Sequence, residues 1–421
     1  MKKTKLISSL TALGLVGTSV PIVATSCTNE SKENYIVVSG NKISMPEVVT
    51  QADINGLGVV SYTFAKNVTH DAVFVNGEYI EADLISEICI KNTDGTDMNL
   101  PTNFISYSSS GFHGCVNLRK LDLKAVRVKC NNNNSQRIAI EGCANSLMEL
   151  SVPTMVDDGS GMALGILGLY YQFDALEKID LSGFSDVELT IDYFLYGCTS
   201  LRSIDLTPMK KLTQWGNNFM ANCYKLESVN MSGLSKLNMI QTSAFENCYA
   251  LKEINLNGCT NVQEISANFL MNCSSLKTID LSSFVNLTKI YQNFLSDCSS
   301  LTSVDLSHSE LLIADGCFNN GSFLQNCPNL EQVKFGIIPA TAFGSSLTTA
   351  DTTSFTNTFA TQADYDNWMT KHNGVIKIIV NSSVQTGWNT VAASGGRFAP
   401  LATTWTSSDD AFRTLEVSTE E

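Results

Sequence analysis

Cys198-Thr-Ser-Leu201-Arg-Ser-Ile204-Asp205-Leu206 is a short stretch whose pattern returns every 25 residues, without slippage, through the centre of the chain. The pattern is Cys-x-x-Leu-x-x-Ile/Val-Asp/Asn-Leu/Met, and it begins at Cys198, Cys223, Cys248, Cys273 and Cys298. A fixed period of this length indicates a solenoid, in which each repeat is one structural unit. No unit can bury its apolar residues alone, so neighbouring units must stack around one continuous core.

The same pattern extends beyond these units, with irregular spacings that hold insertions. A weak match surrounds Ile88, and clearer units begin at Cys115, Cys143, Phe173 and Cys327. About ten repeats therefore span residues 84–340, and Leu-x-x-Ile-x-Leu in each predicts a leucine-rich-repeat solenoid. The Ile-x-Leu runs predict parallel strands on the concave face of a curved, β-rich superhelix, with the residue between Ile and Leu outward. Because the repeats contain no long helical period, we expect short strands and 3-10 turns on the convex side.

At these residues the chain resembles the BspA-type, or Treponema-type, leucine-rich repeats of bacterial surface proteins. Units of that family also carry Phe, then Cys or Asn, then Leu-x-x-Ile-x-Leu. The resemblance covers roughly residues 84–340 and implies a solenoid displayed on a cell surface. Members of the family are mostly described as adhesins or surface antigens, so the resemblance also implies a protein or matrix partner without identifying it.

The N-terminus has the composition of a secretory signal at residues 1–26, with a basic start and an uncharged, mostly apolar stretch after it. Pro21-Ile-Val-Ala-Thr-Ser-Cys27 resembles the relaxed lipoboxes of mollicute surface lipoproteins. This resemblance implies that Cys27 is lipidated and anchors the mature chain on the extracellular face of a bacterial cell membrane. The form departs from the common Leu-Ala-Gly-Cys pattern, and an ordinary signal peptide with a chance cysteine is the alternative.

The flanks of the repeats predict further segments. Residues 27–34 read as a tether, residues 35–83 as an N-terminal cap with strand-like stretches, and residues 341–421 as a C-terminal cap and tail. Solenoids need caps because their end units otherwise expose apolar core. Within the last segment we expect helices at 364–372 and 383–393, a strand at 375–380 and a frayed tail from 406.

The charge of the chain excludes some partners. Its net charge is −14, and it becomes −17 when residues 1–26, which hold three lysines and no acid, are removed. Nucleic acid is a poor partner for such a protein, because its binding depends on Lys and Arg that neutralise phosphates. Anionic lipid headgroups would also repel it. The expected membrane anchor is therefore covalent lipid rather than a basic patch.

Thirteen cysteines invite a chemical interpretation. Eight share one slot of the repeat, with a one-residue shift in the second: Cys115, Cys143, Cys198, Cys223, Cys248, Cys273, Cys298 and Cys327. Neighbouring strands lie about 4.8 Å apart, which permits a disulfide, although in-register side chains point the same way and suit one poorly. We expect a structural ladder of buried thiols that donate weakly to the turn backbone, with disulfides or a metal as the alternatives. Because zinc spacings and catalytic motifs are missing from the sequence, we predict no enzyme, no metal and no cofactor.

The outward residue of each strand is the candidate partner-binding feature. The row is polar and mostly acidic, and comprises Asp122, Asp180, Asp205, Asn230, Asn255, Asp280 and Asp305. Adjacent carboxylates about 5 Å apart repel by roughly 1 kcal/mol in water, and nothing in the core requires Asp at this position. One interpretation is a solubilising row, and the other is a shallow acidic groove for a cationic or basic partner. The row lacks aromatic residues, which argues against sugar stacking there, whereas Tyr224 and Tyr249 form a small aromatic patch on one rim.

Together these features predict a membrane-anchored surface lipoprotein that binds macromolecular partners through its solenoid, in adhesion or host interaction. The alternative is a surface-coat or antigenic protein without a defined ligand.

Overall fold

The computed structural model describes residues 42–45, 59–63, 69–75, 78–81, 87–90, 98–100, 116–124, 126–130, 143–157, 172–190, 192–314, 317–318, 322–343, 356–357, 363, 366–367, 370, 375–392, 411–412 and 414–419. The predicted signal peptide, the tether, Cys27 and Cys115 lie outside these residues. Among the described residues, no helix has both the length and the apolar character needed to cross a membrane.

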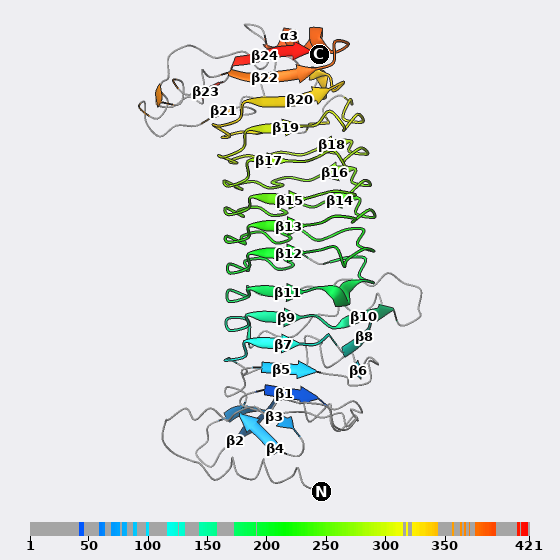
Figure 1. The fold of residues 1–421 in the computed structure, drawn as a ribbon, viewed down its shortest axis with the longest axis vertical. Coiled ribbons are helices and arrows are strands. Elements are labelled where there is room, and N and C mark those ends of the chain that lie inside the picture. The colour runs from blue at the N-terminus through cyan, green and yellow to red at the C-terminus, as the bar shows by residue number, and fades with distance from the viewer. Residues whose placement is uncertain are drawn as a thin grey trace, which may run out of the picture.

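The described coils stack into a solenoid with a column of short parallel strands on one face, here called the strand face (Figure 1). In order along the column these are β1 (Lys42–Met45), β5 (Glu87–Ile90), β7 (Lys120–Asp122), β9 (Glu149–Ser151), β11 (Lys178–Asp180), β12 (Ser203–Asp205), β13 (Ser228–Asn230), β15 (Glu253–Asn255), β17 (Thr278–Ile279), β19 (Ser303–Asp305), β20 (Gln332–Gly336), β22 (Val375–Val380) and β24 (Thr414–Thr419). Each of the ten predicted units, from β5 to β20, contributes its strand. The predicted leucine-rich-repeat solenoid is therefore confirmed.

The opposite side of the coils, here called the back face, carries a second and shorter set of parallel strands. One sheet contains β6 (Met98–Leu100), β8 (Val126–Cys130) and β10 (Thr154–Asp157), and another contains β14 (Met239–Ile240), β16 (Glu264–Ile265) and β18 (Lys289–Ile290). A 3-10 turn, η4 (Ser182–Phe184), lies between them in sequence. These short elements are the ones that the missing helical period predicts.

The core is built from residues that recur at the same slot of every coil. Leu201 and Leu206 are fully buried and Ile204 nearly so, as the inward positions of the pattern require. Aromatic rings stack along the axis in the Phe slot, with centroids of Phe194 and Phe219 5.1 Å apart. Such continuous packing between coils gives the solenoid its stability, because each repeat contacts only its neighbours.

One coil departs from this stack of phenylalanine rings, and the next coil compensates for the change. Trp215 occupies a slot that holds Ile in the following coils, and its ring stacks on Phe219 with centroids 4.5 Å apart. In the next coil the Phe slot holds Ala244, and the ring has moved to Phe245, which meets Trp215 edge-on at 6.0 Å. We attribute Ala244 to the volume of Trp215, since a close-packed interior tolerates a larger side chain only where a neighbouring side chain is smaller.

The two ends of the chain differ in part from the sequence-based expectation. The parallel column begins at β1, earlier than residue 84, because β1 pairs with β5 in register. In the sequence between β1 and β5, the strands β2 (Val59–Thr63), β3 (Thr69–Val75) and β4 (Glu78–Glu81) form an antiparallel sheet. At the other end, β22 coincides with the predicted strand, and α3 (Gln385–Ala392) with the second predicted helix.

The expected frayed tail is wrong for residues 414–419, which form β24 and pair with β22 along its whole length. A small antiparallel pair joins β21 (Thr356–Asn357) to β23 (Ala411–Phe412). Trp388 of α3 is fully buried, stacks on Phe335 at 4.6 Å, and donates its Nε1–H to the carbonyl of Ile338 beside η5 (Ala340–Phe343). That these terminal segments act as caps stays a prediction.

Candidate functional site

The structure brings the predicted outward row together on the strand face. Register places Asp205 beside Asn230, and Asn230 beside Asn255. All of its members are exposed or half-buried. We call these residues the Asx row: Asp122, Asp180, Asp205, Asn230, Asn255, Asp280 and Asp305.

Every residue of the Asx row has a structural task. Its side-chain Oδ1 accepts a hydrogen bond from the backbone N–H two residues later, at 2.8–3.2 Å, in all seven cases. This is an Asx turn, in which the side chain imitates a backbone turn, and it bends the chain at the end of each strand. The expectation that the fold places no requirement on this position is therefore wrong. Asp and Asn serve equally as acceptors, which explains why both occur.

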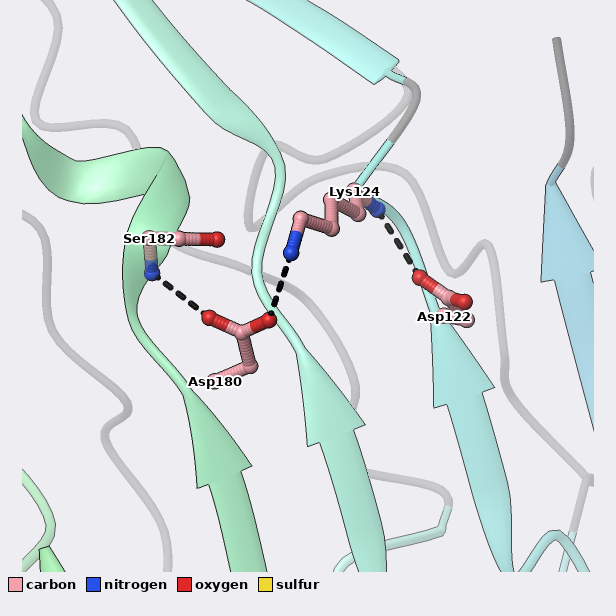
Figure 2. Close-up of polar contacts among 4 residues, drawn as sticks. All are labelled: Asp122, Lys124, Asp180 and Ser182. Atoms are coloured by element: carbon pink, nitrogen blue, oxygen red, sulfur yellow. Dashed lines mark hydrogen bonds and ion pairs between the residues drawn. The ribbon is translucent and has the colours of Figure 1, made fainter.

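The charges of the row are also partly compensated. Lys124 donates its backbone N–H to Asp122, and its Nζ lies 3.0 Å from Oδ2 of Asp180 across the intervening strand (Figure 2). Further along, Nδ2 of Asn230 donates to Asp205 at 3.2 Å, and Lys334 lies 4.0 Å from Asp305. The face is consequently a mixed polar surface and not a continuous acidic groove.

These contacts change the pKa values of two carboxyls in the row. Burial raises the pKa of Asp180, but hydrogen bonds from Ser182 and the nearby Lys124 outweigh it, so that the pKa lies below its usual value. Hydrogen bonds from Ser282 likewise lower the pKa of Asp280. Both side chains therefore carry their full charge at neutral pH.

Beside the Asx row, ion pairs run along the axis from coil to coil. Glu149 lies between Lys120 at 3.5 Å and Lys178 at 3.0 Å. One position further from the Asx row, Glu227 lies between Arg202 at 2.8 Å and Lys252 at 2.7 Å. Exposed pairs of this kind contribute little stability each. They do show that the sign of the charge alternates along the strand face.

The cysteine slot is fully interior. Its described members Cys143, Cys198, Cys223, Cys248, Cys273, Cys298 and Cys327 are buried and form no disulfide. From the second regular coil on, each Sγ donates to a backbone carbonyl of the preceding coil, as Cys248 does to Met220 at 3.4 Å. Burial raises the pKa of the Cys248 thiol, so the group is not a nucleophile at neutral pH.

A row of amides precedes the cysteines, and the sequence reasoning missed it. Asn222, Asn247 and Asn272 have φ between 61° and 63°, a left-handed region that Asn tolerates better than most residues. Nδ2 of Asn247 donates to Oδ1 of Asn222, and Nδ2 of Asn272 to Oδ1 of Asn247, both at 2.7 Å. The signal was visible, since Asn or Asp stands directly before the cysteine in most regular units. Cys259, which lies outside the ladder, is also buried and donates to Met231 at 3.4 Å.

Within the described part of the chain, no group of three or more His, Cys, Asp or Glu side chains is arranged to hold a metal ion. The described outward rows are polar and charged, and their hydrogen bonds are explained by turns and by contacts between coils. What this arrangement offers chemically is a long polar surface with regularly spaced side chains.

Comparison with known proteins agrees with the repeat geometry. The profile of the BspA type leucine rich repeat region matches residues 168–284 and 234–367, with six copies. Residues 168–367, just under half of the chain, are thus similar to the BspA-type leucine-rich repeats. Proteins of this family are typically structural or binding proteins and not enzymes, and leucine-rich-repeat solenoids generally bind protein partners.

Solved structures with similar repeats come from several bacteria. A leucine-rich repeat protein of T. pallidum is 16% identical, with a TM-score of 0.29, covering 52% of this chain and 87% of that one. A leucine rich cell surface protein of Faecalibacterium prausnitzii is 15% identical, with a TM-score of 0.26 and coverage of 68% and 89%. The pneumococcal vaccine antigen PcpA is 14% identical, with a TM-score of 0.25 and coverage of 84% and 93%. No curated protein sequence matches this chain significantly.

Proposed function

We propose that this chain is a lipid-anchored bacterial surface protein whose solenoid binds a protein or matrix partner through the strand face, in adhesion or host interaction. The observation that carries the proposal is the in-register column of strands, which presents parallel rows of exposed side chains over many coils. Solenoids use such extended surfaces for binding. The Asx row bounds the surface, and the row beside it is free to vary.

That neighbouring row is the part of the surface that the fold constrains least. It holds Lys178, Ser203, Ser228, Glu253 and Thr278 at one and the same position of successive coils. Because basic, hydroxyl and acidic side chains all occur there, the repeat places no chemical requirement on it. Specificity for a partner is expected to reside in this row, while carboxylates of the Asx row add attraction to a basic partner. Such attraction acts mainly on the association rate and weakens with salt.

The test uses an array of host matrix proteins and cells probed with the purified chain. The quadruple variant Asp180→Asn, Asp205→Asn, Asp280→Asn and Asp305→Asn keeps the Asx acceptors, as Asn230 and Asn255 show, and removes four charges. Weaker binding with a shallower salt dependence supports the acidic contribution. Unchanged binding and salt dependence assign the Asx row to turn formation alone, and loss of binding in Ser203→Arg with Ser228→Arg would then locate the partner on the neighbouring row.

The anchor is tested separately. Lipidation at Cys27, inferred from the sequence before it, predicts a diacylglyceryl adduct on the N-terminal peptide of the native protein, detected by mass spectrometry. One acyl chain would hold only marginally, and two give stable attachment. An unmodified chain released into the medium contradicts this part of the proposal and leaves the binding surface untouched.

One observation favours the surface-coat alternative: the Asx turns account for the recurrence of Asp and Asn in successive repeats without any ligand. A coat protein would show no saturable binding to any member of the array, in the wild type or in the variants.

A further inference from the structure

The edge of the solenoid that leads into the strand face carries an aromatic pair which the strand face lacks. Tyr224 and Tyr249 follow the ladder cysteine in adjacent coils, and their rings stack with centroids 5.4 Å apart and planes inclined by 21°. They remain 44% and 45% exposed. The same column continues with the small residues Thr199 and Ser274, so no large side chain of the column covers either outer side of the stack.

Basic side chains accompany these rings. Lys225 is exposed and directly follows Tyr224. Arg202 and Lys252 share the single carboxylate of Glu227, at 2.8 Å and 2.7 Å, in the column that follows the turn. Lys277 extends that column by one more coil and is exposed.

The two columns run side by side along the axis, because backbone hydrogen bonds join successive coils at or next to both columns. Ser275 donates its backbone N–H to the carbonyl of Tyr249, and Lys252 donates to that of Glu227. In the four coils that begin at Cys198, Cys223, Cys248 and Cys273, the carboxylates between the cysteine and the strand face are Glu227 and Glu253, against four cations. The coil before them places Asp174 and Glu177 in the same two columns, so the excess of cations is confined to these four coils of a chain whose net charge is −14. Hydrogen bonds from Lys252 and Arg202 lower the pKa of Glu227, in keeping with a positive surrounding.

We propose that this turn-edge strip binds a carboxylated polysaccharide, one sugar of which packs on an outer face of the tyrosine stack. The strip comprises Arg202, Tyr224, Lys225, Tyr249, Lys252 and Lys277. A sugar ring presents an apolar C–H face that packs on an aromatic ring, while tyrosine keeps a polar hydroxyl at its rim. Lysine and arginine then meet the carboxylates of the polymer, and hydroxyls such as that of Ser275 are available to its alcohols.

Two other classes of partner fit this strip less well. Protein hot spots are desolvated apolar pockets surrounded by other contacts, and between residues 198 and 277 the tyrosine pair supplies the only exposed large apolar side chains. Nucleic acid requires many cations along its phosphates, and the strip holds few in a strongly acidic chain. The inference does not depend on strand-face binding, because the residues and the partner are different.

The experiment measures binding of the full chain to immobilised hyaluronan, an unsulfated carboxylated polysaccharide, by biolayer interferometry. Dextran serves as the neutral sugar control and poly-L-glutamate as the control for charge alone. We expect binding to hyaluronan, little to poly-L-glutamate and none to dextran. Removal of both rings in Tyr224→Ala with Tyr249→Ala should weaken binding about tenfold, whereas Tyr224→Phe with Tyr249→Phe should retain most of it.

Charge is tested with two matched pairs. Lys225→Gln with Lys277→Gln should weaken binding and flatten its salt dependence. Lys210→Gln with Lys236→Gln removes the same charge from exposed positions outside the strip and should leave binding unchanged. Far-ultraviolet circular dichroism confirms that each variant is folded. The inference is overturned by absence of hyaluronan binding, by equal binding of poly-L-glutamate, or by equal effects of the two lysine pairs.

Discussion

Replacement of Asp280 distinguishes the structural role of the Asx row from a role in recognition. Its Oδ1 accepts the backbone N–H of Ser282 at 2.9 Å. A hydrogen bond is worth about 0.5–1.5 kcal/mol net, and somewhat more when the acceptor is charged. Because Asp280 is exposed and water can replace part of the bond, we expect Asp280→Ala to cost about 1 kcal/mol. Asp280→Asn keeps the acceptor and should cost less than about half of that.

Urea denaturation followed by circular dichroism measures the difference, provided that the slope of the transition is the same in all variants. Thr278→Ala is the matched control, since Thr278 is exposed on β17, which ends one residue before Asp280, and surface changes of this kind fall within about 0.5 kcal/mol. Equal costs for Asp280→Asn and Asp280→Ala would refute the reasoning, as would an alanine variant as stable as wild type.

Cys248→Ala should cost about 1–2 kcal/mol by opening a small cavity, and the native thiol should resist alkylation until the protein is denatured; a disulfide-linked peptide between coils would contradict the ladder. Asn247→Ala loses both amide bonds and strains a backbone at φ 61°, so we expect about 2–3 kcal/mol in urea melts, with Asn247→Gly about 1 kcal/mol milder. Gly183→Ala would drive a Cβ into the backbone carbonyl of Pro153 in the neighbouring coil and should cost at least about 2 kcal/mol, whereas Gly387→Ala, with open space around it, should raise the thermal midpoint slightly. Since carboxyls such as Asp180 have a pKa below that of the unfolded chain, their stabilisation is complete above about pH 5 and is lost on acidification; an unchanged urea midpoint at pH 3 would contradict this.

The fold was predictable because its determinants are local and repeated. A period of 25 residues states which side chains share a slot, and burial of the Leu and Ile positions then follows from stacking alone. The strand at β24 was not predictable in the same way. Its sequence lies outside the repeat, and its pairing with β22 is a tertiary contact that the 25-residue period does not predict.

The Asx row shows a different limit. Its outward position was predicted from the alternation along the strand, but the fold was taken to place no constraint on the residue type there. The restriction to Asp and Asn, with neither Ser, Lys nor Gln at the regular positions, was the available signal of a turn acceptor. Neutralisation of Asp180 by Lys124 could not be inferred, because the two residues are 56 apart in sequence and meet across an intervening strand.

The pairing of Trp215 with Ala244 bears on how such a chain can change length in evolution. In-frame loss or duplication of one repeat is harmless where the neighbouring units are interchangeable, as between the coils that begin at Cys248 and Cys273. Each unit alters the reach of the molecule by about 4.8 Å. Loss of residues 223–247 is different, because it would set Trp215 against Phe269 in place of Ala244. Changes in repeat number should therefore be best tolerated on the C-terminal side of Ala244, where the length of the solenoid can vary at little cost to its core.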